Sequence, residues 1–449
     1  MTVTRRSRSA PNDRELRLWR VGRALALSFC VAVLVAGCVF LSLVYLLDFQ
    51  EIDNTQKLDA KTLFDLVKLS FGVVAGAGAL VALVVAYRRQ RVDEAGAHRE
   101  ATRLHTERFS QAVDKLGSDS PAVRLGGVHS LAGLADDAPD DDLRQTCIDV
   151  LCAYLRLPFS PDPGDLPTPP DGTPPPEEQR DAHQEKRNRY RALREVRHTI
   201  LRLIGDHYRI PTGTHRTWQG CNLDLTGITI DGQMSFEGAK FSGGFVRFNG
   251  ARFSSDDVRF NEAEFSGGDV TFVGAEFSGG VTSFDDAEFS GDVVSFNNAQ
   301  FQSGMVSFDN AEFSGHGVSF EDAAFAGGEV FFGGAKFTRG AVRFSRAAFS
   351  GGKVNFNTAA FSGGEVSFGH AKFLGGVVSF GARFSGGNVY FDYARFSGGD
   401  VYFHDAEFSG GSVHFDASTG PAPGGLLDAV STPVPAEIRL RPDWLPATP

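Results

Sequence analysis

Cysteine is scarce in this 449-residue chain, which contains five Cys. Cys30 and Cys38 lie in an apolar stretch, and Cys147, Cys152 and Cys221 are scattered. No disulfide framework is therefore expected, and a reducing compartment is indicated. A surplus of positive charge is also lacking, because the formal net charge is −11. Direct binding to nucleic acid, in which Lys and Arg neutralise phosphates, is not expected.

The sequence also lacks signatures of catalysis. The Gly pairs mark turns and do not join a strand to a helix, as phosphate-binding loops do. A Ser follows Phe in most repeats, which indicates a corner residue rather than a nucleophile with a base beside it. The eleven His are dispersed, and those in the repeats (His316, His370, His404 and His414) occupy outward positions that neighbouring repeats do not share. We therefore predict no enzymatic activity, no cofactor and no metal site.

Phenylalanine, by contrast, is abundant: the chain has 40 Phe, and most fall in a periodic stretch at residues 234–417. One series recurs every 12 residues over 241–373, and a second does so over 236–380. The period slips once, at residues 380–384, where one residue is missing. A short period maintained over so long a stretch predicts a solenoid, in which each unit buries its apolar face by stacking on its neighbours.

The composition of each unit predicts short strands separated by turns. A small or β-branched residue stands two positions before each Phe, which places both side chains on one side of an extended segment. Gly and Ser follow, and Gly supplies the positive φ that turns require. Two Gly in each unit would cost a helix roughly 2 kcal/mol relative to Ala, which excludes helix.

A coil of this solenoid could hold one 12-residue unit or two. One unit would face two Phe across a very flat interior, and protein interiors are close-packed with little slack for large rings. We therefore favour two units, roughly 24 residues with four inward Phe, which gives about seven coils at the spacing of β-strands.

The segment Ala263-Glu264-Phe265-Ser266-Gly267 resembles the pentapeptide repeat, here in a Phe-rich variant, and the resemblance extends over residues 218–417. It implies an all-β right-handed quadrilateral β-helix, with the central Phe and the preceding Ala facing inward. Alternate corners depart from the family pattern by two extra residues. The predicted structural core comprises Phe241, Phe253, Phe260, Phe265, Phe272, Phe277, Phe284, Phe289, Phe296, Phe301, Phe308, Phe313, Phe320, Phe325, Phe332 and Phe337.

Two apolar stretches precede the repeats, at residues 24–47 and 66–87, each long enough to cross a bilayer. The segment 1–23 and the start of 88–157 are rich in Arg, and the loop 48–65 between the stretches is net acidic. This pattern predicts a two-helix transmembrane hairpin with an extracytoplasmic loop and both termini in the cytoplasm. The protein would then be a multi-pass protein of the plasma membrane, with the lipid bilayer as one partner.

The segments between the hairpin and the repeats have distinct compositions. Residues 88–157 are predicted to form a cytoplasmic helical region whose helix pair resembles a single HEAT-type unit; a spacer and a partner-docking surface are both open. Nine Pro at 158–178 predict a semi-extended linker. An amphipathic helix within 179–217 is expected to cap the repeats at 218–417. Residues 418–449 are expected to form a C-terminal cap and a loose tail.

Charge is segregated along the repeats. Residues 256–330 contain fifteen Asp and Glu and one basic residue, whereas residues 331–396 contain eight Lys and Arg and two acidic residues. The candidate interaction surface comprises Asp257, Glu264, Glu276, Glu288, Glu312, Arg343 and Arg346. In a 24-residue coil, residues 264, 288 and 312 would align. A solvated shaft is one interpretation; the other is a bipolar rod whose acidic half contacts a basic protein, or the basic half of another copy in a homo-oligomer.

Two functions of different classes follow. The first is a non-enzymatic, membrane-tethered scaffold that presents a rigid charged β-helix to a cytoplasmic protein partner. The alternative is a DNA-mimicking modulator of a DNA topoisomerase (gyrase), because some pentapeptide-repeat proteins resemble duplex DNA in shape and charge. The acidic half of the repeats favours this alternative, whereas the expected anchor and the basic half do not.

Overall fold

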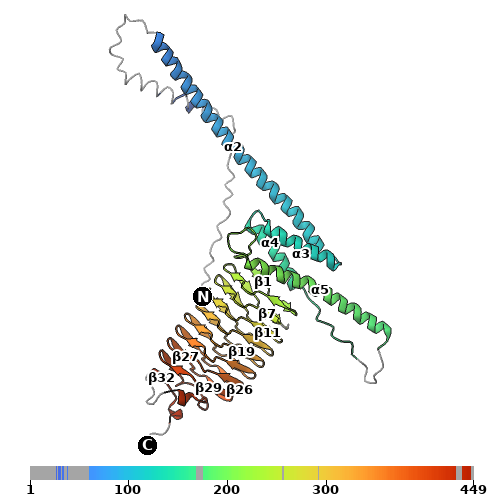
Figure 1. Cartoon of the computed structure of the whole chain (residues 1–449), viewed down its shortest axis with the longest axis vertical. Helices are drawn as coiled ribbons and strands as arrows, with labels where there is room; N and C mark the ends of the chain where they lie inside the picture. The colour runs from blue at the N-terminus through green and yellow to red at the C-terminus, as the bar shows by residue number, and fades with distance from the viewer. Residues whose placement is uncertain are drawn as a thin grey trace, which may run out of the picture. The chain divides into compact units, whose positions relative to one another are not determined.

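The computed structural model of the protein describes residues 27, 29–31, 33, 34, 38, 60–167, 175–254, 257–291, 293–430 and 437–445. Residues 1–102 and 103–449 form two compact units. Within the second unit, a group of helices precedes a stack of short strands (Figure 1). All residues predicted for the repeat core and the interaction surface belong to this second unit.

Helix α2 (Ala60–Leu116) is 57 residues long and contains the predicted second membrane span at 66–87. In the part of the chain that the structure describes, no helix is long and apolar enough to cross a membrane. This finding contradicts the predicted transmembrane hairpin and the plasma-membrane localisation. Gly and Ala occupy six of the eight positions 72–79 of α2, and they contribute less to transfer into lipid than Leu, Ile, Val or Phe. The first predicted span, 24–47, and the loop after it lie mostly outside the described residues.

The strands form a solenoid with four faces, built from parallel ladders. The first face is a 10-stranded sheet in the order β1 (Leu223–Asp224), β5 (Val246–Arg247), β9 (Asp269–Thr271), β13 (Val293–Ser295), β17 (Gly317–Ser319), β21 (Ala341–Arg343), β25 (Glu365–Ser367), β28 (Asn388–Tyr390), β31 (Ser412–His414) and β32 (Ile438–Arg439). The second face comprises β2 (Thr229–Ile230), β6 (Arg252–Phe253), β10 (Glu276–Phe277), β14 (Gln300–Phe301), β18 (Ala324–Phe325), β22 (Ala348–Phe349), β26 (Lys372–Ser379) and β29 (Arg395–Tyr402).

The other two faces complete each coil. The third face comprises β3 (Met234–Ser235), β7 (Asp257–Arg259), β11 (Val281–Ser283), β15 (Met305–Ser307), β19 (Glu329–Phe331) and β23 (Lys353–Asn355), and it joins the second face through β26. The fourth face is an 8-stranded sheet of β4 (Lys240–Phe241), β8 (Glu264–Phe265), β12 (Glu288–Phe289), β16 (Glu312–Phe313), β20 (Lys336–Phe337), β24 (Ala360–Phe361), β27 (Arg383–Phe384) and β30 (Glu407–Phe408).

Successive strands of one face lie one coil apart. Phe265 pairs in register with Phe289, and Phe289 with Phe313, so each coil contains 24 residues and two repeat units. The prediction of a β-solenoid with two units per coil is thereby confirmed. The solenoid has about nine turns over residues 223–439, more than the roughly seven expected, because β1, β2 and β32 extend the stack beyond the regular repeats.

The interior consists of stacked Phe rings. The rings of Phe265, Phe289, Phe313 and Phe337 lie nearly parallel, with successive centroids 4.9, 4.9 and 4.8 Å apart. Ladders from different faces meet edge to face, as Phe284 and Phe296 do at 5.9 Å and 90°. All sixteen predicted core Phe are at most 1% exposed, and the Ala two positions before many of them are equally buried. Each aromatic pair adds about 0.5–1.5 kcal/mol beyond the burial of its surface.

The missing residue at 380–384 is absorbed at one corner. At the regular corners the Ala before the next Phe bonds back three residues, as Ala359 N–H does to Phe356 O at 3.1 Å. At the short corner, Ala382 N–H bonds back only two residues, to Phe380 O at 2.6 Å. The tighter turn removes one residue, yet Phe384 still stacks on Phe361 at 5.0 Å. The slip therefore leaves the core ladders continuous.

Three helices cover the start of the solenoid: α3 (Pro121–Asp136), α4 (Asp141–Arg156) and α5 (Glu177–Arg209). They pack on one another, and α4 and α5 contact the first coil (Figure 1). The approach of α5 is close, because a Cβ at Gly205 would lie 2.6 Å from the Ser235 carbonyl oxygen of β3. Tyr208 at the end of α5 is fully buried, and its ring lies 4.9 Å from that of Phe241. We call α3, α4 and α5 together the cap.

The far end of the solenoid is also covered. Leu426 in α6 (Leu426–Ala429) and the following Val430 are buried, whereas Leu427 is exposed. Trp444 of the 3-10 helix η2 (Pro442–Trp444) packs against Phe396 and Phe415, with ring centroids 6.1 and 5.9 Å apart. These contacts shield the last Phe rings from water.

Candidate interaction surface

The strongest alignment of outward charges lies on the fourth face. Glu264, Glu288 and Glu312 are register neighbours on β8, β12 and β16, as the 24-residue coil predicts. Lys240 precedes them on β4 and Lys336 follows on β20, so a cation stands at each end of the row. Lys240 forms an ion pair with Glu264. We call the three glutamates the acidic ladder. Like charges at this spacing repel one another, although water and salt screen them.

The other four predicted surface residues lie on different faces. Asp257 is on the third face, where it pairs with Arg259 at 2.6 Å. Glu276 is on the second face and pairs with Arg252, one coil earlier, at 3.0 Å. Arg343 ends β21 on the first face, and Arg346 occupies the corner that follows. The seven residues therefore do not form one patch: the acidic ladder is brought together on the fourth face, and Arg343 and Arg346 meet separately at Glu321.

Ion pairs also bridge the acidic and basic parts of the repeats. Arg346 contacts Asp322 at 2.8 Å and Glu321 at 3.4 Å, both from the preceding coil. The hydrogen bond from Arg346, despite partial desolvation, holds the pKa of Asp322 below its usual value. Exposed pairs of this kind stabilise by roughly 0.2–1 kcal/mol each. The boundary between the two charged parts is thus partly neutralised within one molecule.

Corner side chains link successive coils through the backbone. Asn297 Oδ1 accepts the N–H of Glu321 at 3.0 Å, and Asp309 Oδ1 accepts that of Gly333 at 2.6 Å. Burial raises the pKa of Asp309, and the neighbouring carboxylates of Asp285 and Asp286 raise it further against the effect of the Gly333 bond. These bonds satisfy corner N–H groups that the strand ladders leave unpaired.

The cap is held by irregular polar contacts. Asp136, largely buried at the end of α3, accepts hydrogen bonds from Trp218 Nε1–H and Arg216 Nε–H at 3.2 Å and contacts His207 Nε2 at 3.1 Å. The buried Arg197 of α5 donates to the carbonyl oxygens of Leu155 at 2.7 Å and Thr229 at 3.1 Å. Its guanidinium therefore ties α5 to both α4 and the first coil.

A second carboxylate joins α5 to the first coil. Asp231 accepts a hydrogen bond from the Tyr190 hydroxyl at 2.7 Å, and its carboxylate lies 3.5 Å from His198 Nε2. Burial raises the pKa of Asp231, but the bonds from His198 and Tyr190 outweigh it, so the pKa lies below its usual value. The charged carboxylate is thus the form that the folded cap favours.

The cysteine thiols of the second unit are poorly suited to chemistry. Burial raises the pKa of Cys147 and of Cys152 to about 12 and that of Cys221 to about 11. A nucleophile or metal ligand must be a thiolate, which these values disfavour near neutral pH.

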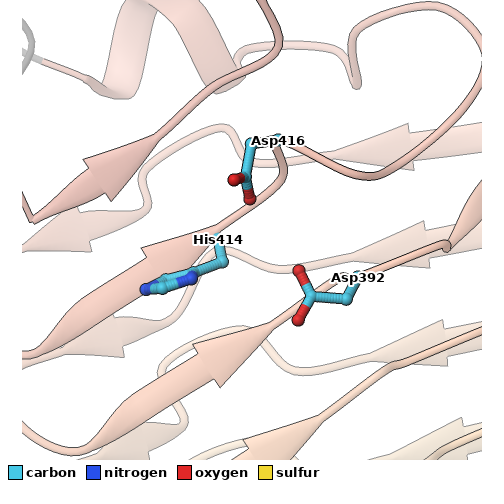
Figure 2. Close-up of side chains that lie close together, drawn as sticks. All are labelled: Asp392, His414 and Asp416. Carbon is cyan, nitrogen blue, oxygen red and sulfur yellow. The ribbon is translucent and has the colours of Figure 1, made fainter.

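One group of possible metal ligands does come together in the part of the chain that the structure describes. Asp392, His414 and Asp416 each offer a ligand atom, and these atoms lie within 4.8 Å of one another. Figure 2 shows the carboxylates of Asp392 and Asp416 on neighbouring chain segments, with the side chain of His414 beside them. Sequence reasoning missed this group because it judged His414 alone, although residues 392 and 416 are 24 apart and hence neighbours in the coil.

Comparison with known proteins supports the repeat assignment. Residues 272–324 match a family model described as pentapeptide repeats (9 copies). No curated protein and no solved structure matches the chain. Residues 272–324 are therefore similar to pentapeptide repeats, and the Phe-rich repeats around them form a β-solenoid.

Proposed function

We propose that the solenoid is a non-catalytic scaffold that presents the acidic ladder to a protein with a basic surface. The acidic ladder carries the proposal: three carboxylates stand in register on one face, fixed by Phe rings stacked directly beneath them. A rigid row of like charges is preorganised for a complementary surface and needs little ordering on binding. Relief of the repulsion within the row also favours association.

Host proteins that bind the chain can be compared between variants by proximity labelling. The test variant carries Glu264→Gln, Glu288→Gln and Glu312→Gln, which removes the charge of the ladder and keeps side-chain size. The matched control carries Glu329→Gln and Glu365→Gln, which are exposed on the third and first faces. We expect the labelled partner to be lost with the test variant and retained with the control. The same partner set for both variants would contradict the proposal.

The second candidate is modulation of a DNA topoisomerase by mimicry of DNA. Regularly spaced carboxylates in the acidic ladder favour it, because they resemble a row of phosphates. A gyrase supercoiling assay with the full chain tests it: inhibition should appear with the natural sequence and weaken with the triple Gln variant. If the full chain leaves supercoiling unchanged, mimicry is excluded and the protein-scaffold proposal stands.

A further inference from the structure

The group at the C-terminal coils differs from other corners in what its side chains do. Asp392 follows β28, and Asn297 and Asn249 occupy the corresponding corner position four and six coils nearer the cap. Asn249 and Asn297 accept the N–H of the residue 24 further on, at 3.0 Å each. Among the described residues, the carboxylate of Asp392 makes no such bond to Asp416, and neither Asp416 nor the ring nitrogens of His414 have a hydrogen-bond or ion-pair partner. Three polar groups thus converge without satisfying one another.

The positions of these groups are fixed by the solenoid. His414 is the last residue of β31, and its backbone carbonyl accepts the N–H of Phe391 at 2.8 Å. Its ring packs edge to face on Tyr390 of the preceding coil, with centroids 5.0 Å apart. Asp392 and Asp416 each follow a buried core ring, Phe391 and Phe415, whose centroids are 4.5 Å apart. The backbone that carries all three groups is therefore rigid.

The geometry suits a metal ion of the transition series. Bonds from Zn²⁺ to His nitrogen or carboxylate oxygen are about 2.0–2.2 Å, so two ligand atoms of a tetrahedral site lie about 3.4 Å apart. The three atoms lie within 4.8 Å of one another, and side-chain rotations that move them by about an ångström bring them into range. An imidazole nitrogen favours Zn²⁺ and its neighbours over Ca²⁺ or Mg²⁺, which prefer oxygen.

We propose that Asp392, His414 and Asp416 bind a divalent transition-metal ion such as Zn²⁺, which clamps the last two regular coils together. Asp392 belongs to one coil, and His414 and Asp416 belong to the next. An ion bound by all three side chains therefore links two successive coils. Beyond β31 the first face continues only with the two-residue β32, so a link between β28 and β31 supports a part of the stack that has few further neighbours. Arg439, the register partner of His414 on β32, places a positive charge nearby and limits the affinity of the site.

Metal stoichiometry of the full chain tests the site. We expect the natural protein to bind one more equivalent of Zn²⁺ than the His414→Gln variant, measured by calorimetry and by competition with a chromophoric chelator. His404→Gln is the matched control, because His404 is a repeat histidine at a different corner and should leave the stoichiometry unchanged. Equal stoichiometry for the natural protein and His414→Gln, or no binding by either, overturns the proposal.

The role of the carboxylates is tested separately with Co²⁺, whose visible absorption reports its ligands. The double variant Asp392→Asn and Asp416→Asn keeps His414, so the band should be lost or strongly shifted; an unchanged band overturns the assignment of these ligands. Circular dichroism confirms that the outward substitutions leave the solenoid folded.

Hydrogen exchange tests the clamp. Zn²⁺ should slow amide exchange in β28 and β31 of the natural protein at least tenfold, and should have no effect there in His414→Gln. Binding without slower exchange would overturn the clamp.

Discussion

The cap and the solenoid of the second unit are stabilised in different ways. In the solenoid the same few contacts recur in every coil, such as the ring stacking of Phe289 on Phe313 at 4.9 Å. In the cap each contact occurs once, as in the bonds from Arg197 to Leu155 and Thr229. A repeated contact can be lost at one coil while its neighbours remain, whereas a single polar tie has no substitute. The predictions below test this difference, beginning with the largest expected effect.

Phe313→Ala should lower the free energy of unfolding by about 3–5 kcal/mol, because it leaves a cavity in the middle of a ring ladder. Phe313 is 1% exposed and stacks on Phe289 and Phe337. Chemical denaturation of the full chain measures the loss. Phe408→Ala is the control: Phe408 is only partly buried and stacks on Phe384 at 5.0 Å, so the loss should be clearly smaller. Equal losses at both positions would contradict the expectation that a Phe ring stacked on both sides contributes more to stability than a ring stacked on one side.

Arg197→Met should destabilise the cap by about 2–3 kcal/mol, because Met fills the space but leaves the carbonyl oxygens of Leu155 and Thr229 without their donor. The effect should be local. Hydrogen exchange should quicken in α5 and α4 and stay unchanged in the coils beyond β12. Arg202→Met, in an exposed i,i+4 pair with Asp206, is the control and should change little.

Two aspartates should respond to pH with opposite sign. Asp231 in the cap has a lowered pKa, so its contribution to stability is full above the pKa of the unfolded chain and is lost as pH falls through the folded value. Asp231→Asn should cost about 1–2 kcal/mol at pH 7 through its weakened bonds, and the cost should shrink in acid. Asp309 in the solenoid has a raised pKa, so its charge opposes folding at neutral pH.

Asp309→Asn should accordingly stabilise the solenoid at pH 7, by at most about 1 kcal/mol after solvent screening. An amide oxygen can still accept the Gly333 N–H. The gain should disappear as pH falls through the raised pKa, since the natural carboxyl then becomes neutral too. Denaturation curves between pH 3 and pH 7 (about the carboxyl range) measure both variants. A gain for Asp231→Asn or a loss for Asp309→Asn at neutral pH would contradict these assignments.

The smallest expected effect concerns a corner. Thr358 has φ 63°, a left-handed conformation that a β-branched residue adopts at a cost. Thr358→Asn should stabilise by about 0.5–1 kcal/mol, since Asn tolerates this region. Asn310 occupies the same corner two coils earlier with φ 58°, so Asn310→Thr provides the reverse test and should destabilise by a similar amount. Thermal unfolding measures the pair.

The solenoid and the cap also differ in how much of their structure the sequence predicts. The period of 12, together with the space that Phe rings need, predicted the 24-residue coil and hence the row of Glu264, Glu288 and Glu312. Alternation within each unit and the resemblance to pentapeptide repeats predicted the inward Phe. The repeat pattern did not predict that α4 packs on β1 or that Asp136 meets Trp218 and His207, since these contacts join residues whose neighbours in sequence share no pattern. The membrane prediction was wrong. It considered the length of the two apolar stretches and did not weigh the small residues that make up much of the second one.

The left-handed corners were also missed in part. Sequence reasoning assigned positive φ to Gly, which holds at Gly268 and Gly328. At the alternate corners the structure places Glu262, Arg346 and Tyr393 in the same conformation. No local preference predicts this for such residues, because the stacked coils on either side impose it.

The short corner at residues 380–384 has a consequence for how such chains can grow. Arrays of repeats lengthen when a stretch of coding sequence is copied beside itself, and the copied stretch need not contain a whole number of units. The backbone at this corner closes with one residue fewer while Phe384 keeps its place on Phe361, so an array whose copied stretch is one residue short can still form continuous ladders. Corners, more than faces, are therefore where length variation between related arrays should accumulate.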